Sequence, residues 1–177
     1  MQKRKTISDD YIALQQQAHE GRYGHRGFKH LPEVIRFAHI LGAETILDYG
    51  AGKGSLGKAL RITELYKEVV DYDPAILEFQ AKPDKQFDLV VCTDVAEHIE
   101  PEYLDAFLTN LFEYSRLGCF MLISCEDTKV KLSDGRSAHL TVKSPKWWQG
   151  KLNDMTWRKL EYRDRCKELL VWAYRQK

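Results

Sequence analysis

The 177 residues include 44% hydrophobic and 11% aromatic side chains, enough to bury a core, so residues 1–177 are expected to form a single globular domain. The 27 Lys and Arg residues nearly balance the 26 Asp and Glu residues, which excludes an overall basic field for binding nucleic acid. The sequence has neither the apolar core of a signal peptide nor a run of about 18 apolar residues that could span a bilayer. A cytoplasmic protein with no membrane partner is therefore expected.

Two helices are predicted before the first strand, in an N-terminal helical segment of residues 1–44. The first covers Asp9 to Glu20, and the second runs from about Pro32 to Leu41 after a glycine-rich break. Strands and helices then alternate through residues 45–125. The predicted elements there are a strand over 44–50, a helix over 55–62, strands over 67–73 and 87–94, a helix over 101–115 and a strand over 119–125.

The C-terminal part, residues 126–177, is expected to hold a short helix and a pair of strands. Ser144 and Pro145 open the helix, and the strands form a hairpin within residues 157–177. The apolar strands at 87–94 and 119–125 suit the centre of a sheet covered on both faces. This alternation predicts an α/β fold with an open, largely parallel sheet that binds its ligand at the carboxyl ends of the strands.

The glycine-rich turn after the first strand is compatible with two classes of ligand. One register, G-x-G-x-x-G from Gly52, is followed about twenty residues later by Asp73, as in a dinucleotide-binding fold. The other register, D-x-G-x-G-x-G, starts at Asp48 and includes Gly50, Gly52 and Gly54. This register resembles one found in the class I S-adenosylmethionine-dependent methyltransferases, and it suits their sulfonium cofactor, because an anion attracts the positive charges while bare backbone faces the carboxylate of the amino-acid tail. A pyrophosphate would be repelled by Asp48.

The second register resembles motif I of the class I S-adenosylmethionine-dependent methyltransferases, and two further stretches are similar to that family. VVDYDPA resembles the end of its second strand, which implies that Asp73 accepts hydrogen bonds from both ribose hydroxyls of the cofactor. FDLVVCTDVAEHIEP is similar to its fourth-strand segment, which implies that Thr93 or Asp94 lies near the cofactor. Three motifs in the family's order favour a small methyltransferase that uses S-adenosylmethionine over a dehydrogenase. Residues 45–125 are then the cofactor-binding half, and 126–177 lie on the substrate side.

The resemblance also implies a Rossmann-like sheet of seven strands, the last antiparallel, with helices on both faces. Only thirteen residues separate Asp73 from Phe87, so the family's third strand is expected to be short or absent. The residue that meets the adenine amino group is therefore not assigned, and the ring is expected to rest on apolar side chains such as Ile76 or Leu77. Tyr23 precedes the first strand where some family members contact the cofactor's carboxylate; ordinary loop structure is an equal alternative.

Two histidines are candidates for the chemistry. The sulfonium already activates the methyl group, so transfer needs a positioned acceptor and, for a hydroxyl or amine, a base to take its proton. His98 and His139 are both expected at the rim of the sheet where the methyl group emerges. The alternative is that each histidine has a structural role.

A metal site is the sharper form of this hypothesis. Asp94, Glu97 and His98 form D-x-x-E-H, similar to the E-x-x-E-H of metal-dependent small-RNA 2′-O-methyltransferases, whose later histidine His139 could supply. Many relatives carry a similar segment without a metal, in which Glu97 caps the next helix and His98 packs locally. A divalent metal is therefore possible but not expected.

The sequence does not identify the methyl acceptor. With no large inserted lid or added recognition domain, the expected acceptor is a hydroxyl of a small molecule. A nucleic acid or nucleotide acceptor is the second interpretation. A third is a partner protein that binds S-adenosylmethionine without transferring its methyl group.

Overall fold

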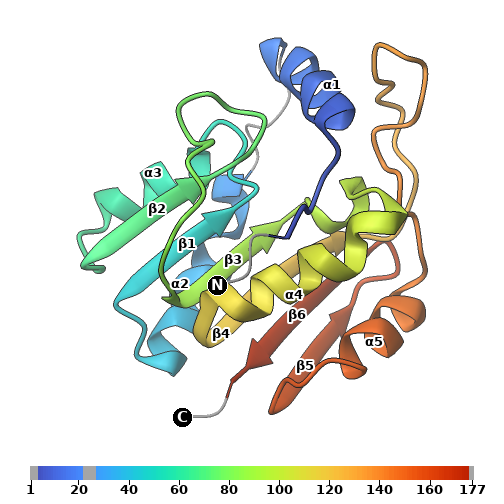
Figure 1. The fold of residues 1–177 in the computed structure, drawn as a ribbon. Coiled ribbons are helices and arrows are strands. Elements are labelled where there is room, and N and C mark those ends of the chain that lie inside the picture. The colour runs from blue at the N-terminus through green and yellow to red at the C-terminus, as the bar shows by residue number, and fades with distance from the viewer. Residues whose placement is uncertain (1–3, 22–26, 176–177) are drawn as a thin grey trace.

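The computed structural model of the protein describes residues 4–21 and 27–175. Six strands form one open sheet in the order β2-β1-β3-β4-β6-β5 (Figure 1). The strands are β1 (Thr45–Tyr49), β2 (Glu68–Tyr72), β3 (Phe87–Thr93), β4 (Ser115–Ser124), β5 (Lys159–Asp164) and β6 (Glu168–Tyr174). The first four are parallel, and β6 is antiparallel to both of its neighbours. The predicted sheet, with its antiparallel last strand and C-terminal hairpin, is confirmed.

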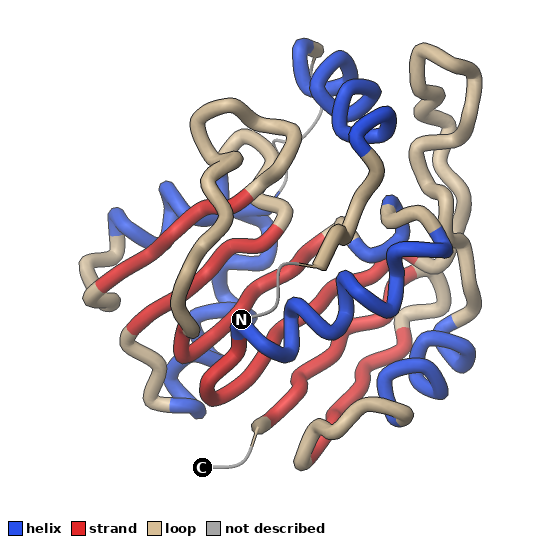
Figure 2. Tube along the Cα trace, viewed as in Figure 1, coloured by secondary structure: helices blue, strands red, loops and turns tan. Residues whose placement is uncertain are grey.

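Helices cover both faces of the sheet (Figure 2). The α-helices are α1 (Asp9–Glu20), α2 (Leu31–Leu41), α3 (Ser55–Ile62), α4 (Leu104–Tyr114) and α5 (Pro145–Asn153), and the short 3₁₀ helices are η1 (Gly27–His30), η2 (Ala96–His98) and η3 (Pro101–Tyr103). Phe37 of α2 and Leu56 of α3 belong to one apolar cluster, and Phe107 of α4 and Trp148 of α5 to another. Every residue of β3 between these layers is buried, as predicted for a central strand. Among the described residues, each helix is too short or too polar to cross a lipid bilayer.

The fourth strand begins earlier than its apolar run. It was expected from residue 119, but β4 starts at Ser115, directly after α4 and without a loop. The Ser115 hydroxyl donates to the Leu111 carbonyl at 2.7 Å, while Ser115 is already in register with Phe87 of β3. Polar Ser115 and Arg116 hid this part of the strand from the hydrophobic pattern.

Residues 73–86 form turns and contain no strand, which confirms that the family's third strand is absent. The Asp73 N–H donates to the Phe79 carbonyl at 3.0 Å and closes this loop on itself. The chain segment before α1 runs between the loop and α4 (Figure 1). Lys82 of the loop donates to the Arg4 carbonyl at 3.2 Å, and the Arg4 side chain pairs with Glu113 of α4. The sheet therefore ends at β2, and the N-terminal segment links the loop to α4.

A buried carboxylate at the amino end of the sheet joins three segments. Asp88 of β3 accepts hydrogen bonds from the N–H groups of Glu44 at 2.9 Å and Thr45 at 3.2 Å, and it pairs with Arg116 of β4. Burial raises the pKa of Asp88, but these donors outweigh burial and hold it below its ordinary value. Asp88 therefore stabilises the fold far from the carboxyl ends of the strands.

The Asp88→Asn variant is expected to lower the free energy of unfolding by about 2 kcal/mol, the scale of hydrogen bonds to a charged group. Because the folded-state pKa is depressed, this stabilisation is present above the carboxyl's unfolded pKa of about 4 and is lost as the pH falls through the folded value. Urea denaturation should therefore show a gap from wild type that shrinks on acidification. Asp105→Asn, which removes an exposed partner of Lys151, should cost under about 1 kcal/mol. A gap that does not change with pH would contradict this account.

Candidate active site

A cavity of about 710 Å³ lies at the carboxyl ends of the parallel strands, where the sequence predicted a ligand. Gly50, Gly52 and Asp73 line one part of it, and Glu97, His98 and His139 line another. Residues of α1 and of the segment 126–144 also line it, so these two parts of the chain form a cover over the sheet edge (Figure 1). The cavity is large enough for a cofactor-sized ligand.

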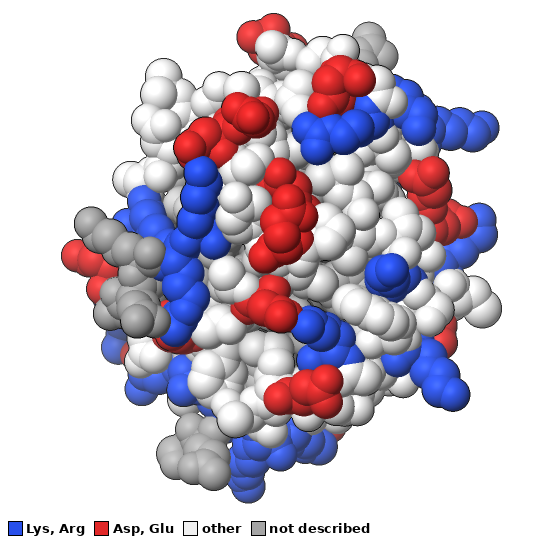
Figure 3. Space-filling model, turned by 45° about the vertical axis from the view of Figure 1, so that its right-hand side comes forward, with Lys and Arg blue, Asp and Glu red and all other residues white. Residues whose placement is uncertain are grey.

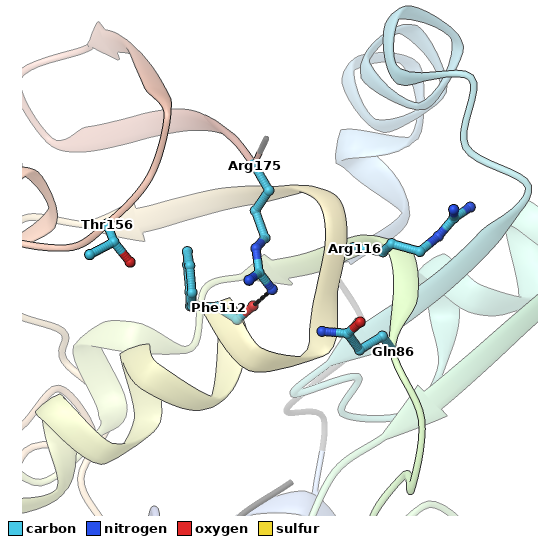
Figure 4. Close-up of a pocket in the computed structure, with 5 residues that line it drawn as sticks. All are labelled: Gln86, Phe112, Arg116, Thr156 and Arg175. Atoms are coloured by element: carbon cyan, nitrogen blue, oxygen red, sulfur yellow. Dashed lines mark hydrogen bonds between the residues drawn. The ribbon is translucent and has the colours of Figure 1, made fainter. Parts of the chain in front are cut away.

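A smaller cavity of about 390 Å³ lies at the opposite end of the sheet (Figure 4). Arg175 lies over the Phe112 ring and donates to the Phe112 carbonyl at 2.8 Å. Arg116 is paired with Asp88, and Gln86 donates to a backbone carbonyl of α4. Since these polar side chains already have protein partners, the larger cavity is the candidate active site.

The glycine turn after β1 brings backbone to the cavity wall. Gly50 has φ +80°, and a Cβ there would lie 2.4 Å from Val95 Cγ2, so no other residue fits. Gly52, at φ +54°, donates its N–H to Asp73 Oδ2 at 2.9 Å. Gly54 was also expected to face the cofactor, but it does not line the cavity; it precedes α3 and packs against Phe79. Gly54 therefore shapes the turn.

Asp73 is a rigid pair of acceptors at the end of β2. Besides Gly52, the N–H of Ala75 holds it, donating to Oδ1 at 2.9 Å, and the residue is 7% exposed. Burial raises the pKa of Asp73, and the N–H groups of Ala75 and Gly52 oppose that effect. Each oxygen retains a further lone pair, so the carboxylate can accept from two neighbouring hydroxyls.

Asp48 lines the cavity, where the sequence placed an anion for the cofactor. Burial, and then the charges of Asp71 and Asp73, raise the pKa of Asp48 to about 8. The N–H of Gly57 acts in the opposite direction and lowers the pKa. Burial and the neighbouring acids therefore favour the neutral form of this carboxyl in the protein alone. A cation placed beside it would lower that pKa, so Asp48 can become charged when such a ligand binds.

The remaining expectations for the cofactor end have mixed outcomes. Thr93 and Asp94 line the cavity at the end of β3. Ile76 and Leu77 do not line it; Leu77 is 81% exposed, and Pro74 with Ala75 lines the wall beside Asp73 instead. The short loop turns back within four residues of Asp73, which directs Leu77 to solvent. Tyr23 lies outside the described residues.

Three of the four candidate metal ligands come together. One ligand atom each of Glu97, His98 and His139 lies within 4.8 Å of the others, and the two imidazole rings have centroids 4.7 Å apart. Asp94 lies outside this group. In a continuous helix, residues three apart such as Asp94 and Glu97 would share one face. Here η2 begins only at Ala96, and Asp94 has a left-handed φ of +55°, so Asp94 is not on the helix that carries Glu97.

Both histidines hold a defined tautomer through backbone carbonyls. Nδ1 of His98 lies 2.6 Å from the Ala138 oxygen, and Nδ1 of His139 lies 2.8 Å from the Glu126 oxygen. A carbonyl can only accept, so each Nδ1 carries the proton and each neutral ring has its lone pair on Nε2. The arrangement is typical of histidines that bind a metal or accept a proton through Nε2.

Glu97 is the least expected member of the cluster. It is completely buried, and no described residue donates to either carboxylate oxygen within standard hydrogen-bond geometry, so it does not cap the next helix. Burial, and then the charge of Asp94, raise the pKa of Glu97 to about 8, although the N–H groups of Glu97 and Ser124 oppose this. Burial, and then His139, lower the pKa of His98 to about 4.

The sequence analysis missed the contribution of the N-terminal helices. Tyr11, Gln15 and His19 of α1 line the cavity, as do Lys29 and His30 of η1. The sequence contained a sign of this contribution, because Tyr11, Gln15 and His19 are four residues apart and so share one face of α1. Polar side chains at that spacing are usually solvated, and the helix was left without a role.

The chain is similar in sequence pattern and in fold to known methyltransferases. A family model described as a methyltransferase domain matches residues 23–170. The DhpI complex with S-adenosylhomocysteine aligns with a TM-score of 0.65 and 15% identity over 97% of this chain and 100% of that chain. The 1,6-didemethyltoxoflavin-N1-methyltransferase of Burkholderia thailandensis, with bound 1,6-didemethyltoxoflavin and S-adenosylhomocysteine, aligns with a TM-score of 0.65 and 15% identity. The alignment covers 100% of this chain and 94% of that chain. The methyltransferase domain of bacterial CtHen1 aligns with a TM-score of 0.64 and 15% identity over 83% of this chain and 98% of that chain. No curated protein sequence matches significantly.

Proposed function

The chain belongs to the methyltransferase-domain family and is an S-adenosylmethionine-dependent methyltransferase, and from this premise we propose that its acceptor is a hydroxyl of a small molecule. One observation carries the proposal. A single cavity joins the Asp73 and glycine-turn wall to the cluster of Glu97, His98 and His139. Cofactor and acceptor can therefore meet inside one enclosed space.

The cofactor end follows from the acceptors and backbone of that wall. Asp73 accepts from the two ribose hydroxyls, and the adenine lies against Pro74 and Ala75. The amino-acid tail faces Gly50 and Gly52, whose bare backbone allows close approach. Lys29 of η1 lines the same cavity and adds a positive charge for the carboxylate of the tail. Asp48 becomes an anion as the cationic part of the cofactor arrives.

The acceptor end is the cluster of Glu97, His98 and His139. A base with a pKa of about 4 is poorly matched to removing a proton at neutral pH, which disfavours His98 as a general base. Two imidazole rings and a buried carboxyl group, each with a ligand atom within 4.8 Å of the others, instead fit a divalent cation such as Mn²⁺ or Mg²⁺. When bound there, such an ion would polarise a substrate hydroxyl. We therefore favour metal binding at this cluster and keep the base as the alternative.

A small acceptor is favoured over nucleic acid by the charges on the surface. On the face shown in Figure 3, Lys and Arg side chains are interspersed with Asp and Glu over most of the surface, apart from one strip of Lys and Arg on the left. Two ion pairs join opposite charges near the site, Lys167 with Glu126 and Arg136 with Asp134. A phosphate backbone would need a continuous basic surface.

S-Adenosylhomocysteine is expected to raise the melting temperature of the protein, whereas NAD is not, because only a ligand that prefers the folded state stabilises it. Differential scanning fluorimetry over a range of ligand concentrations measures this directly. Transfer of a labelled methyl group from S-adenosylmethionine into the small-molecule fraction of a cell extract then tests the acceptor class. Label confined to nucleic acid would overturn the small-molecule proposal, and stabilisation by NAD alone would overturn the cofactor.

A further inference from the structure

Two side chains from distant parts of the chain share one backbone oxygen beside the cluster. The Ala138 carbonyl accepts from His98 Nδ1 at 2.6 Å and from the Tyr11 hydroxyl of α1 at 3.2 Å. Gln15, one helical turn after Tyr11, donates its amide to the Tyr11 oxygen at 2.7 Å. The Tyr11 hydrogen is thereby left for Ala138, so the order is Gln15 to Tyr11 to Ala138, with His98 donating from the other side.

This chain of hydrogen bonds is shielded from solvent. Tyr11 and Ala138 are each 1% exposed and Gln15 is 7% exposed, so these three residues present little surface to bulk water. Tyr11 and Ala138 also pack with Leu132 in an apolar cluster separate from the two that cover the sheet. That cluster joins α1 to segment 126–144, the two parts of the cover.

The cover also holds the backbone of residues 97–100. The Glu97 carbonyl accepts from the N–H groups of Leu140 and Thr141, each at 2.9 Å. Glu100 accepts from the N–H and the hydroxyl of Ser8, which begins α1, at 2.8 and 2.7 Å. These contacts fix the main chain beside His98. The contact between the cover and the imidazole ring is the hydrogen bond from Nδ1 to the Ala138 oxygen.

We propose that Tyr11 is a positioning residue for His98, acting through the Ala138 carbonyl. The Tyr11 hydroxyl holds that oxygen against Nδ1, so the ring keeps its proton there and has its lone pair on Nε2. Docking of α1 thereby sets the state of a residue at the acceptor end. The claim that this matters for turnover rests on the proposed function, whereas the tautomer itself is independent of it.

Tyr11→Phe tests the proposal, because it removes the hydroxyl and leaves the ring in its cluster. Imidazole ¹⁵N shifts of the full chain after dialysis against EDTA report the tautomer, with the His98 signals assigned from a His98→Gln variant. We expect wild type to show a protonated Nδ1 and Tyr11→Phe to show shifts averaged toward the other tautomer. Ser133→Ala is the matched control, since it removes an exposed 2.5 Å hydrogen bond to Gln17 between the same two parts of the chain.

Turnover is the second readout. On an acceptor found by the label screen, Tyr11→Phe should lower kcat by roughly tenfold with KM for S-adenosylmethionine within about twofold, and Ser133→Ala should match wild type. Unchanged ¹⁵N shifts in Tyr11→Phe would overturn the proposal even if kcat fell. Equal shift changes in both variants would also overturn it, because general loosening of the cover would then be the cause. A protein that does not bind S-adenosylhomocysteine but shows the expected shifts would overturn the proposed function and not the positioning role.

Discussion

Replacing Asp73 by alanine is expected to weaken binding of S-adenosylhomocysteine by roughly 10- to 150-fold. Hydrogen bonds to a charged acceptor contribute about 1.5 to 3 kcal/mol, and each 1.4 kcal/mol is about a tenfold change in affinity. Asp73 is already ordered by the N–H groups of Gly52 and Ala75, so little freedom is lost when the ribose hydroxyls bind. Isothermal calorimetry measures the affinity directly.

Two further variants separate recognition from disturbance of the turn. Glu78→Ala removes an exposed acid from the same loop, outside the cavity, and should bind with wild-type affinity. Asp73→Asn keeps one carbonyl oxygen and should fall between alanine and wild type. If a folded Asp73→Ala protein bound S-adenosylhomocysteine as tightly as wild type does, the ribose would have to lie elsewhere in the cavity.

The cofactor wall was predictable because its signals are local. Gly50 and Gly52 follow an apolar strand directly, and Asp73 ends the next strand, so the parallel sheet alone brings them to one edge. The absent third strand was predictable from chain length between Asp73 and Phe87. The state of Asp48 was not, because its pKa depends on burial and on Asp71 and Asp73, which only the folded chain brings close.

The acceptor end was harder to predict. Glu97 and His98 are adjacent in sequence, but His139 lies in a segment without helix or extended strand. The sequence therefore placed His139 only at the same rim of the sheet, and the family resemblance suggested that it would join the other two. The exclusion of Asp94 depends on a single left-handed backbone conformation. The contact of Tyr11 with Ala138 spans 127 residues, and no periodicity encodes a contact of that kind.

His98→Ala and His139→Ala are each expected to lower turnover by roughly a hundredfold or more, the scale of a lost proton acceptor or metal ligand, with cofactor affinity within a few fold of wild type. Steady-state kinetics on the acceptor from the label screen measures this. His39→Ala is the matched control, because His39 is an exposed histidine of α2 outside the cavity. Normal turnover in both cluster variants would return His98 and His139 to structural roles.

Removal of metal separates the two versions of the cluster. If Glu97, His98 and His139 hold a cation, EDTA should abolish turnover, and Mn²⁺ or Mg²⁺ should restore it. Electron paramagnetic resonance should then find one bound Mn²⁺ per chain, weakened in Glu97→Gln, which keeps the size of the side chain and loses its charge. If His98 is instead a base, EDTA should have no effect, and the rate should fall on acidification through the His98 pKa of about 4, since a base must be unprotonated to act. Wild-type Mn²⁺ binding by Glu97→Gln would place the ion away from the buried carboxylate and leave that group without a role in the reaction.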